Sequence, residues 1–564
     1  MIDIYEKLSE DRKKSQEQGL TPEWYSTAGY QLFHDKYLYQ ADSIKGQFER
    51  IASTAARHLN KIGKEQEAKE KFFNLLWSGK LSPSTPVLAN MGTNRGMPVS
   101  CSGGVVEDSI DGFYSSLHEI CMLTKNGFGT SSDLSSIRPR GSKISRGGKA
   151  SGVLPVYKMH VQAMRDVAQG TARRGAWAGY LDIEHGDFDE LADYILSEPD
   201  DANVGWIIKD SFIKSLQSGD KEALRRYQKT LKLKMVLGKG YYCFIDKINR
   251  KRPTMYSENG MTVKASNLCD EITLFADKDH TFTCVLSSLN IAKWDEITED
   301  DIFWSTVFLD CVAEEFIQVA KGVRGLEKAV RFTEKGRALG LGQCGFHTYL
   351  QTKFIPFDSF EAHQISSRVA KTIFDASLKA SQWMAKELGE PEWCKGYGVR
   401  NTHRIAIAPT KSTAVLMGGV SEGINPDPAM VYTQMTAGGE MERVNPQLLP
   451  LMKERGKYTK KVITELKDKM GSVQHVDWLS PEEKEVFKTA FEINQEAVIR
   501  LASVRGRWID QWQSLNLFFS ADENEGWVSH IHQMAFEDEN ILGTYYIYSS
   551  SGVQASKEEC AACQ

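Results

Sequence analysis

Three residues between positions 267 and 271 have the types and spacing of a small catalytic site. Asn267, Cys269 and Glu271 alternate with Leu268 and Asp270, and alternate side chains of an extended segment share one face. A thiol, a carboxylate and an amide would then lie close together, which suits redox or nucleophilic chemistry. Burial as an inert core cysteine is the competing interpretation, but a buried carboxylate needs a partner or a function.

Further cysteines lie in short apolar runs. Cys284 belongs to a run that predicts a buried strand, and Cys101 follows a short loop at the start of another. Taken alone, each is a structural core residue. The chain has ten cysteines and no secretory signal, which favours thiols over a disulfide framework. Cys560 and Cys563 form a CxxC pair without the further ligands that zinc requires, so we expect no bound metal.

Glycine- and hydroxyl-rich loops supply candidate phosphate sites. The segment 408–414 follows an apolar run and contains Thr410, Lys411, Ser412 and Thr413; hydroxyls and backbone N–H groups at a strand-to-helix turn can hold a phosphate. An ordinary helix N-cap is the alternative. Residues 138–152 and 169–176 combine glycines with cationic side chains, which suits a polyphosphate, although a solvated surface loop also explains such a run.

Composition limits the classes of function. The chain has 564 residues, a net charge of −5, 25% charged and 41% hydrophobic residues, which argues against a dedicated nucleic-acid binder. It contains no uninterrupted apolar run of membrane-spanning length, and its charged start lacks a signal-peptide core. We therefore expect a cytoplasmic protein that associates with neither membrane nor nucleic acid.

The pattern of elements predicts an α/β protein behind a helical start. Residues 1–80 have helical periodicity, 81–548 alternate short apolar runs with helices and glycine loops, and 549–564 have the composition of a flexible tail. The predicted helices include 44–59, 65–77, 110–123, 154–169, 300–321, 359–388 and 481–503. The predicted strands include 100–106, 239–245, 403–408 and 542–549.

The residues and spacing of these motifs resemble those of the ribonucleotide reductase family. Asn267-Leu268-Cys269-Asp270-Glu271 is similar to its radical-cysteine motif Asn-x-Cys-x-Glu. The segments around Cys101 and Cys284 are similar to the strands that carry its two reducing cysteines. The resemblance implies that a thiyl radical on Cys269 abstracts the ribose C3′ hydrogen while Glu271 acts as general base. Asn267 would orient the sugar, and the two reducing cysteines would end as a disulfide.

Two C-terminal features extend the resemblance. Tyr545 and Tyr546 resemble the stacked tyrosine pair with which class I reductases receive a radical from a second subunit; in a regular strand the two rings would face opposite sides, and core packing is the alternative. Cys560 and Cys563 on the tail would re-reduce the spent disulfide by exchange and be reset by thioredoxin or glutaredoxin.

The same resemblance assigns nucleotide contacts. Thr85 and Ser100 match substrate-contacting positions, and residues 410–413 match the substrate-phosphate loop, although Lys411 departs from the small or acidic residue typical there. Four residues match positions that bind an allosteric effector at a dimer interface: Asp108, Ser109, Arg138 and Arg173. Next to Arg173, Arg174 replaces a glycine of the family.

The resemblance thus implies the large subunit of a class I ribonucleotide reductase without the N-terminal ATP-binding domain. Its fold would be a ten-stranded α/β barrel with Cys269 on a central finger loop, assembled as a homodimer. The chain would bind no cofactor of its own: a separate small subunit supplies the radical, and a deoxynucleotide or ATP acts as allosteric effector. A cobalamin-dependent reductase, a glycyl-radical enzyme and a non-catalytic nucleotide-sensing subunit are the alternatives.

Overall fold

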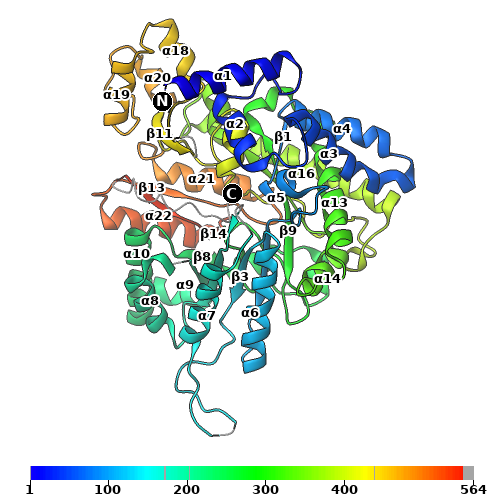
Figure 1. Ribbon diagram of the computed structural model, residues 1–564. Coiled ribbons are helices and arrows are strands. Elements are labelled where there is room, and N and C mark those ends of the chain that lie inside the picture. Colours follow the sequence, from blue (N-terminus) through cyan, green and yellow to red (C-terminus); the bar gives the residue numbers. More distant parts are fainter. Residues whose placement is uncertain (1, 146, 170–172, 202, 437–438, 551–564) are drawn as a thin grey trace.

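The computed structural model describes residues 2–145, 147–169, 173–201, 203–436 and 439–550. In Figure 1 helices surround a central sheet, and a helical layer from the start of the chain covers one side of it. Mixed α/β architecture, predicted from the alternation of apolar runs and helices, is therefore confirmed.

The N-terminal layer follows its sequence signals closely. Helix α3 (Ile44–Ala56) begins behind Ser43, whose side chain accepts a hydrogen bond from the backbone N–H of Gly46, as an N-cap does. Helix α4 (Glu65–Trp77) ends shortly before Gly79, whose φ is 71°. Both helices pack on the long helix α13. The other elements of this layer are α1 (Ile2–Glu17), α2 (Thr27–Leu32), η1 (Phe33–Tyr37) and η2 (Arg57–Ile62).

Nine hydrogen-bonded strands form the main sheet among the described residues. Their order is β1-β9-β2-β3-β6-β7-β8-β14. The ninth strand, β10, also pairs with β9 and lies outside this order. Strands β2, β3, β6, β7 and β8 are parallel, whereas β9 is antiparallel to β2 and parallel to β10. The bounds are β1 (Leu81–Pro83), β2 (Cys101–Val105), β3 (Gly129–Asp133), β6 (Trp177–Asp182), β7 (Val204–Ile208), β8 (Tyr241–Phe244), β9 (Phe282–Asn290), β10 (Leu339–Cys344) and β14 (Gly543–Thr544).

Backbone hydrogen bonds of two further extended segments, 403–407 and 511–517, close the sheet. The N–H of Leu339 on β10 donates to His403 at 2.9 Å, that of Ile407 to Trp512 at 2.9 Å, and that of Tyr545, just past β14, to Leu515 at 2.8 Å. These contacts join β10 to β14 around the ring. The predicted barrel is thereby confirmed, although the expected strand 403–408 makes only an isolated bridge at Ile407.

The finger loop runs through the barrel's interior. The backbone carbonyl of Ser266 accepts from Ser131 Oγ at 2.8 Å, and that of Glu271 accepts from the Trp512 N–H at 3.0 Å. The residues from 265 to 274 are all buried. Because an isolated buried loop would leave polar backbone groups unpaired, the barrel wall must supply partners for this one.

Helices on the outside complete the molecule, and two predictions of their bounds are wrong. The expected helix 481–503 is two helices, because Asn494 caps a new one with its side chain. The helix expected at 154–169 begins at Val153 and ends at Asp166, three residues early. The outer α-helices are α5 (Thr85–Asn90), α6 (Ile110–Lys125), α7 (Val153–Asp166), α8 (Phe188–Ser197), α9 (Asp210–Gln217), α10 (Lys221–Leu237), α11 (Ile245–Lys251), α12 (Thr254–Glu258), α13 (Glu299–Ala320), α14 (Glu327–Gly336), α15 (Phe346–Thr352), α16 (Phe360–Leu388), α17 (Lys411–Leu416), α21 (Gln495–Gly506) and α22 (Glu525–Glu537).

A small lobe with its own apolar cluster lies at one edge of the molecule, at the upper left of Figure 1. It contains the antiparallel pair β11 and β12 and three short helices. Its elements are β11 (Val431–Thr436), β12 (Gly439–Val444), α18 (Leu448–Glu454), α19 (Lys460–Asp468) and α20 (Pro481–Val486). The remaining short elements are β4 (Ala168–Gln169), β5 (Arg173–Arg174), β13 (Leu517–Phe519), β15 (Ile547–Ser549), η3 (Pro199–Asp201), η4 (Ile291–Glu296) and η5 (Glu392–Cys394).

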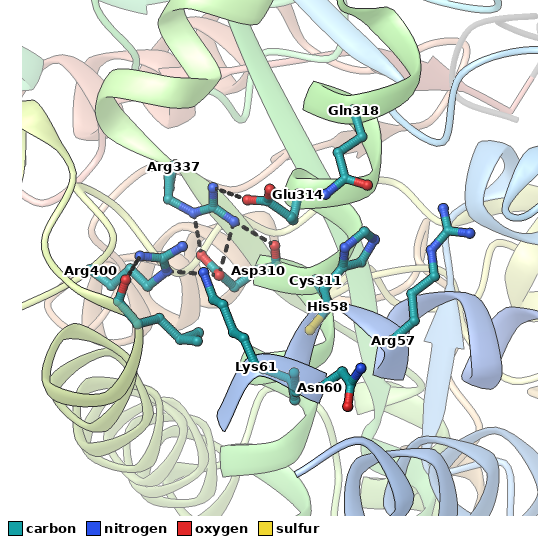
Figure 2. A pocket seen from close by; sticks show the side chains of 12 residues that line it. Arg57, His58, Asn60, Lys61, Asp310, Cys311, Glu314, Gln318, Arg337 and Arg400 are labelled. Carbon is teal, nitrogen blue, oxygen red and sulfur yellow. Dashed lines mark hydrogen bonds and ion pairs between the residues drawn. The ribbon is translucent and has the colours of Figure 1, made fainter. Parts of the chain in front are cut away.

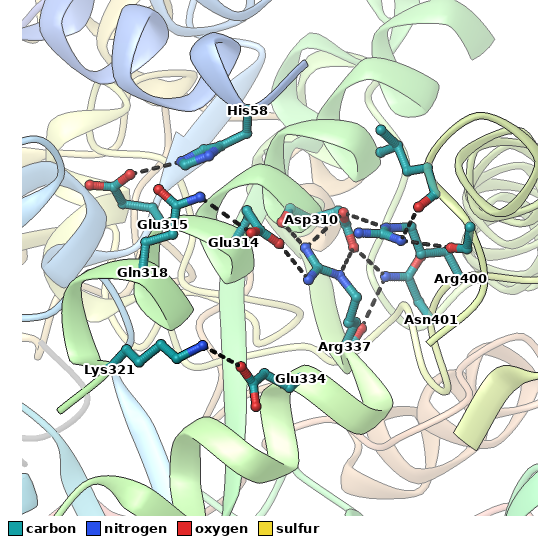
Figure 3. Close-up of polar contacts among 12 residues, drawn as sticks. His58, Asp310, Glu314, Glu315, Gln318, Lys321, Glu334, Arg337, Arg400 and Asn401 are labelled. Carbon is teal, nitrogen blue, oxygen red and sulfur yellow. Dashed lines mark hydrogen bonds and ion pairs between the residues drawn. The ribbon is translucent and has the colours of Figure 1, made fainter. Parts of the chain in front are cut away.

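A buried ion network fixes α13 to Arg337, just after α14, and to the segment 400–401 that leads into 403–407 (Figure 3). Asp310 accepts hydrogen bonds from Arg337 Nε at 2.8 Å, Arg400 Nε at 3.0 Å and Asn401 Nδ2 at 2.9 Å, and Glu314 accepts from Arg337 Nη1 at 2.8 Å. Burial opposes ionisation of Asp310, but the two guanidiniums hold its pKa below the ordinary value. Two cations face two carboxylates, so the network is internally neutral.

The same network borders a cavity of about 440 Å³ between η2 and α13, shown in Figure 2. Arg57 and His58 of η2 line this cavity. Glu315 of α13 accepts hydrogen bonds from His58 Nε2 at 2.8 Å and from Arg57 Nη2 at 2.5 Å. These bonds tie the helical layer to the barrel's outer helix.

Candidate active site

One cavity brings together side chains from five separated stretches of the chain. Its wall includes Cys269 and Glu271 of the finger loop and Cys101 at the start of β2. The remaining wall residues are Ser82, Ser84, Thr85, Pro86, Ser100, Leu286, Ser287, Ser288, Ala408, Pro409, Thr410 and Thr413. A thiol, a carboxylate and several hydroxyls therefore face a common space inside the barrel.

The finger loop reaches this cavity through a turn rather than a strand. Asn267 Oδ1 accepts from the backbone N–H groups of Glu271 at 3.0 Å and Ile272 at 3.1 Å, and Asp270 has φ 60°. The expectation of an extended segment is wrong here, because the Asn side chain replaces a neighbouring strand as hydrogen-bond partner and Asp tolerates the left-handed region. Asn267 thus builds the turn, while its Nδ2 has no partner among the described residues.

Cys101 and Cys284 lie opposite each other on neighbouring strands. They are Cα partners in the antiparallel register of β2 and β9, a relation with a Cα separation of about 4.5–5.5 Å, within the range that a disulfide bridges. Burial is the main cause that raises the pKa of Cys284, and the neighbouring Cys101 acts in the same direction. Gln511 Nε2 lies 3.7 Å from the Cys284 sulfur.

Ser514 supports the catalytic turn from the barrel wall. Its Oγ lies 2.6 Å from the backbone carbonyl of Cys269 and 3.2 Å from Glu271 Oε2. Sequence reasoning missed Ser514 and Gln511, because a serine and a glutamine in a stretch of mixed polar and apolar residues carry no signal until the segment 511–517 is placed beside the loop.

Hydroxyl groups form the remainder of the cavity wall. The buried Oγ atoms of Ser82, Ser84 and Ser100 have no hydrogen-bond partner among the described residues, and Thr85 Oγ1 lies 3.1 Å from Tyr37 Oη. Buried hydroxyls are ordinarily hydrogen-bonded, so this wall suits a polar ligand. Ser100 and Thr85 were predicted; Ser82 and Ser84 were not.

Only some residues of the loop 408–413 line the cavity. Thr410 has φ 55°, and its Oγ1 accepts from the Gly423 N–H at 2.8 Å instead of capping α17. Thr410 and Thr413 line the cavity, whereas Lys411 and Ser412 are outside its lining. The ordinary N-cap interpretation therefore fails for Thr410.

The tyrosine pair is more closely packed than a regular strand allows. The rings of Tyr545 and Tyr546 lie 4.0 Å apart between centroids, and Tyr241 lies 4.7 Å from Tyr545 and 5.6 Å from Tyr546. The two rings do not face opposite sides as they would in a regular strand, because β14 ends at Thr544 and the backbone is irregular before β15 begins. Tyr241 joins the cluster from β8, which its position in the sequence, far from the tyrosine pair, did not indicate.

The predicted effector residues lie beyond the other end of β2. Arg138 Nε donates to Asp108 Oδ2 at 2.5 Å, and Ser109 Oγ caps α6 by accepting from the Gly112 N–H at 2.9 Å. Arg173 belongs to the hairpin of β4 and β5; its side chain lies outside the described residues.

Cys560 and Cys563 also lie outside the described residues. Within the described part of the chain, no helix combines the length and hydrophobicity that crossing a bilayer requires.

Comparison with known proteins agrees with this geometry. The family model "Ribonucleotide reductase, barrel domain" matches residues 99–232, 218–396 and 391–547, and "Ribonucleotide reductase, all-alpha domain" matches 23–96. A putative ribonucleoside-diphosphate reductase large subunit of Frog virus 3 (isolate Goorha) is 31% identical over 89% of this chain and 93% of its own length. The ribonucleoside-diphosphate reductase large subunit of Invertebrate iridescent virus 3 is 28% identical over 93% of this chain and 94% of its own length.

The solved structure of the Actinobacillus ureae class Id ribonucleotide reductase alpha subunit superposes with a TM-score of 0.86 and 36% identity, covering 95% of this chain and 99% of that one. The chain therefore belongs to the ribonucleotide reductase family. It is the large subunit of a class I ribonucleoside-diphosphate reductase. The cobalamin-dependent and non-catalytic alternatives are not favoured.

Proposed function

We propose that Cys269 carries the thiyl radical of the reaction, because it shares the cavity with Glu271 and the hydroxyl wall. The radical sulfur takes the hydrogen atom from ribose C3′ and becomes a thiol, since S–H and activated C–H bonds are similar in strength. Glu271 accepts the 3′-hydroxyl proton as general base. Ser514, within hydrogen-bond distance of Glu271, orients that carboxylate.

Cys101 and Cys284 are the reducing pair in this proposal. One thiol protonates the departing 2′-hydroxyl, which leaves as water. The second thiol supplies the hydrogen that C2′ gains, and the pair, having given two electrons, closes a disulfide. Glu271 returns its proton to the 3′-oxygen, and Cys269 returns its hydrogen atom to C3′. Cys560 and Cys563 reopen the disulfide by thiol–disulfide exchange. Thioredoxin or glutaredoxin reduces the tail cysteines again, and the enzyme works in the cytoplasm.

The tyrosine cluster is the entry route for the radical. A tyrosyl radical at Tyr545 takes the hydrogen atom of the Cys269 thiol, leaving a phenol and a thiyl radical. Tyr546 passes the radical inward from a separate small subunit, and this chain holds no radical cofactor itself. The 4.0 Å separation of the two rings supports direct transfer between them.

The protein binds nucleotides at two separate sites in this proposal, one for the substrate and one for the effector. The substrate's polar groups meet Thr85, Ser100 and the hydroxyls of the 410–413 loop, and Asn267 orients the sugar. A deoxynucleotide or ATP effector binds near the Asp108–Arg138 pair, Ser109 and Arg173 at the interface of a homodimer. The exposed side chains around the start of α6 support an interface there.

Reduction of cytidine diphosphate with a dithiol and a deoxynucleotide effector tests the function. One arm contains a radical-generating small subunit and the other adenosylcobalamin alone. We expect turnover only with the small subunit, and loss of turnover in Cys269→Ala. Turnover with cobalamin alone, or full activity of Cys269→Ala, would overturn the proposal.

A further inference from the structure

A fully buried lysine lies behind the tyrosine cluster. Lys234 of α10 is 0% exposed, and its ammonium donates to the backbone carbonyls of Gly240 at 2.8 Å and Tyr545 at 2.9 Å. The ammonium also lies 4.8 Å from the centre of the Tyr242 ring. Lysine is almost never fully buried without a partner, and the reaction as described above does not use this one.

A fully buried carboxyl group, that of Asp270, lies beside Gly543, two residues before Tyr545. Asp270, the residue after Cys269, is 2% exposed and holds the left-handed position of the catalytic turn. Tyr180 Oη lies 3.3 Å from its Oδ1, whereas Oδ2 has no hydrogen-bond partner among the described residues. Oδ2 lies so close to Gly543 that a Cβ there would be 2.5 Å away.

Both side chains therefore contact the segment 543–545. The Asp270 carboxyl group lies against its first residue and the Lys234 amine donates to the carbonyl of its last, so the segment that carries Tyr545 is held at both ends by buried polar side chains. No ion pair shorter than 4.0 Å joins them directly, but each charge stabilises the other through a low-dielectric interior: Lys234 opposes the burial that raises the pKa of Asp270, and Asp270 opposes the burial that lowers the pKa of Lys234 to about 7.

We propose that Lys234 and Asp270 are a coupled pair of positioning residues that holds Tyr545 in register with the turn of Cys269. This inference rests on the proposed radical route. Losing one charge leaves the other buried and uncompensated, which destabilises this arrangement more than losing both. The alignment of hydrogen donor and acceptor should then depend on the pair, whereas the hydroxyl wall that binds substrate is built from other elements.

A double-mutant cycle tests the coupling in the holoenzyme with its small subunit. The variants are Lys234→Met, Asp270→Asn and their combination, and the exposed pair Lys379→Met and Glu299→Gln is the matched control. We expect each buried single variant to lower kcat by about tenfold or more with an unchanged KM for the ribonucleotide, and the combination to recover most of that loss. The control cycle should show no coupling.

Alkylation of Cys269 by iodoacetamide, measured by mass spectrometry relative to Cys344, gives a readout that needs no radical. Each single variant should alkylate Cys269 several-fold faster, and the combination should return toward the original rate. Folding of the combination where Lys234→Met alone fails would support the coupling equally. Unchanged kcat and alkylation in Asp270→Asn, or strictly multiplicative effects in the cycle, would overturn it. Full turnover of Tyr545→Phe alongside a coupled alkylation cycle would instead remove the radical route and leave the positioning pair in place.

Discussion

Cys101 of β2 lies directly opposite Cys284 of β9 in an antiparallel pair, and only Cys101 faces the cavity of Cys269. A disulfide between them requires little backbone movement, because cross-strand partners already have a suitable Cα separation. Cys284 is held behind Cys101, where burial keeps it protonated by raising its pKa.

Replacing either reducing cysteine should stop multiple turnover. We expect Cys101→Ser and Cys284→Ser to lower steady-state kcat by at least about 100-fold while nucleotide affinity is retained. Differential alkylation after one turnover without external reductant should find the original pair oxidised and the buried Cys344 unchanged. A fully reduced pair after product formation would contradict the assignment.

Removing the phenolic hydroxyl from the tyrosine pair should stop radical entry without changing the fold. Tyr545→Phe keeps the ring and its packing, so we expect the variant to fold but to lose at least about 100-fold in kcat. The control is Tyr157→Phe, whose hydroxyl binds the carbonyl of Asp201 in the core and which should lose stability while keeping substantial turnover.

Gly543 should not tolerate a side chain. A Cβ there would lie 2.5 Å from Asp270 Oδ2 and 2.8 Å from the carbonyl of Tyr242, so Gly543→Ala should cost about 1–3 kcal/mol of unfolding free energy through overpacking. Gly46→Ala in α3, where the nearest atom is 3.5 Å away, is the control and should be neutral or stabilising. Urea unfolding followed by circular dichroism measures both.

Breaking the buried ion network should cost far more than breaking a surface pair. Asp310→Ala leaves Arg337 and Arg400 buried without their shared carboxylate, and we expect a loss of about 3–5 kcal/mol. Lys379→Ala removes an exposed pair with Glu299 and should cost at most about 1 kcal/mol. Equal losses in urea unfolding would contradict the role assigned to the network.

Acid should destabilise the protein in part through His403. Burial lowers the pKa of this histidine from 6.5 to about 4, so the unfolded chain binds a proton before the folded one does. Its contribution to stability is therefore complete above about pH 6.5 and is lost as the pH falls toward 4, by up to about 1.4 kcal/mol per pH unit.

The check compares the original chain with His403→Gln by urea unfolding between pH 7 and pH 4. As the pH falls, the free energy of unfolding should decrease more steeply for the original chain than for His403→Gln. The difference in stability between these two proteins should therefore narrow or reverse in acid. His530→Gln, half exposed at the surface, is the control and should run parallel to the original chain.

Local sequence signals fixed much of the framework. The N-cap at Ser43, the end of α4 before Gly79 and the apolar runs of β2 and β8 lie where the residues predicted them, because capping and hydrophobic periodicity depend on neighbours along the chain. The split between α20 and α21 was missed, since a side-chain cap at Asn494 within a helical pattern is a weak signal.

By itself the sequence determined the candidate groups and the family they indicate: the Asn-x-Cys-x-Glu motif, the two strand cysteines and the adjacent tyrosines resemble those of ribonucleotide reductases. Only the tertiary structure decided how they meet. The support of the turn by Ser514, the contact of Tyr241 with the tyrosine pair and the hydrogen bond from Lys234 to Tyr545 all join segments hundreds of residues apart. Their contacts arise when the barrel closes around the finger loop, and no local pattern encodes a hydrogen bond between such distant segments.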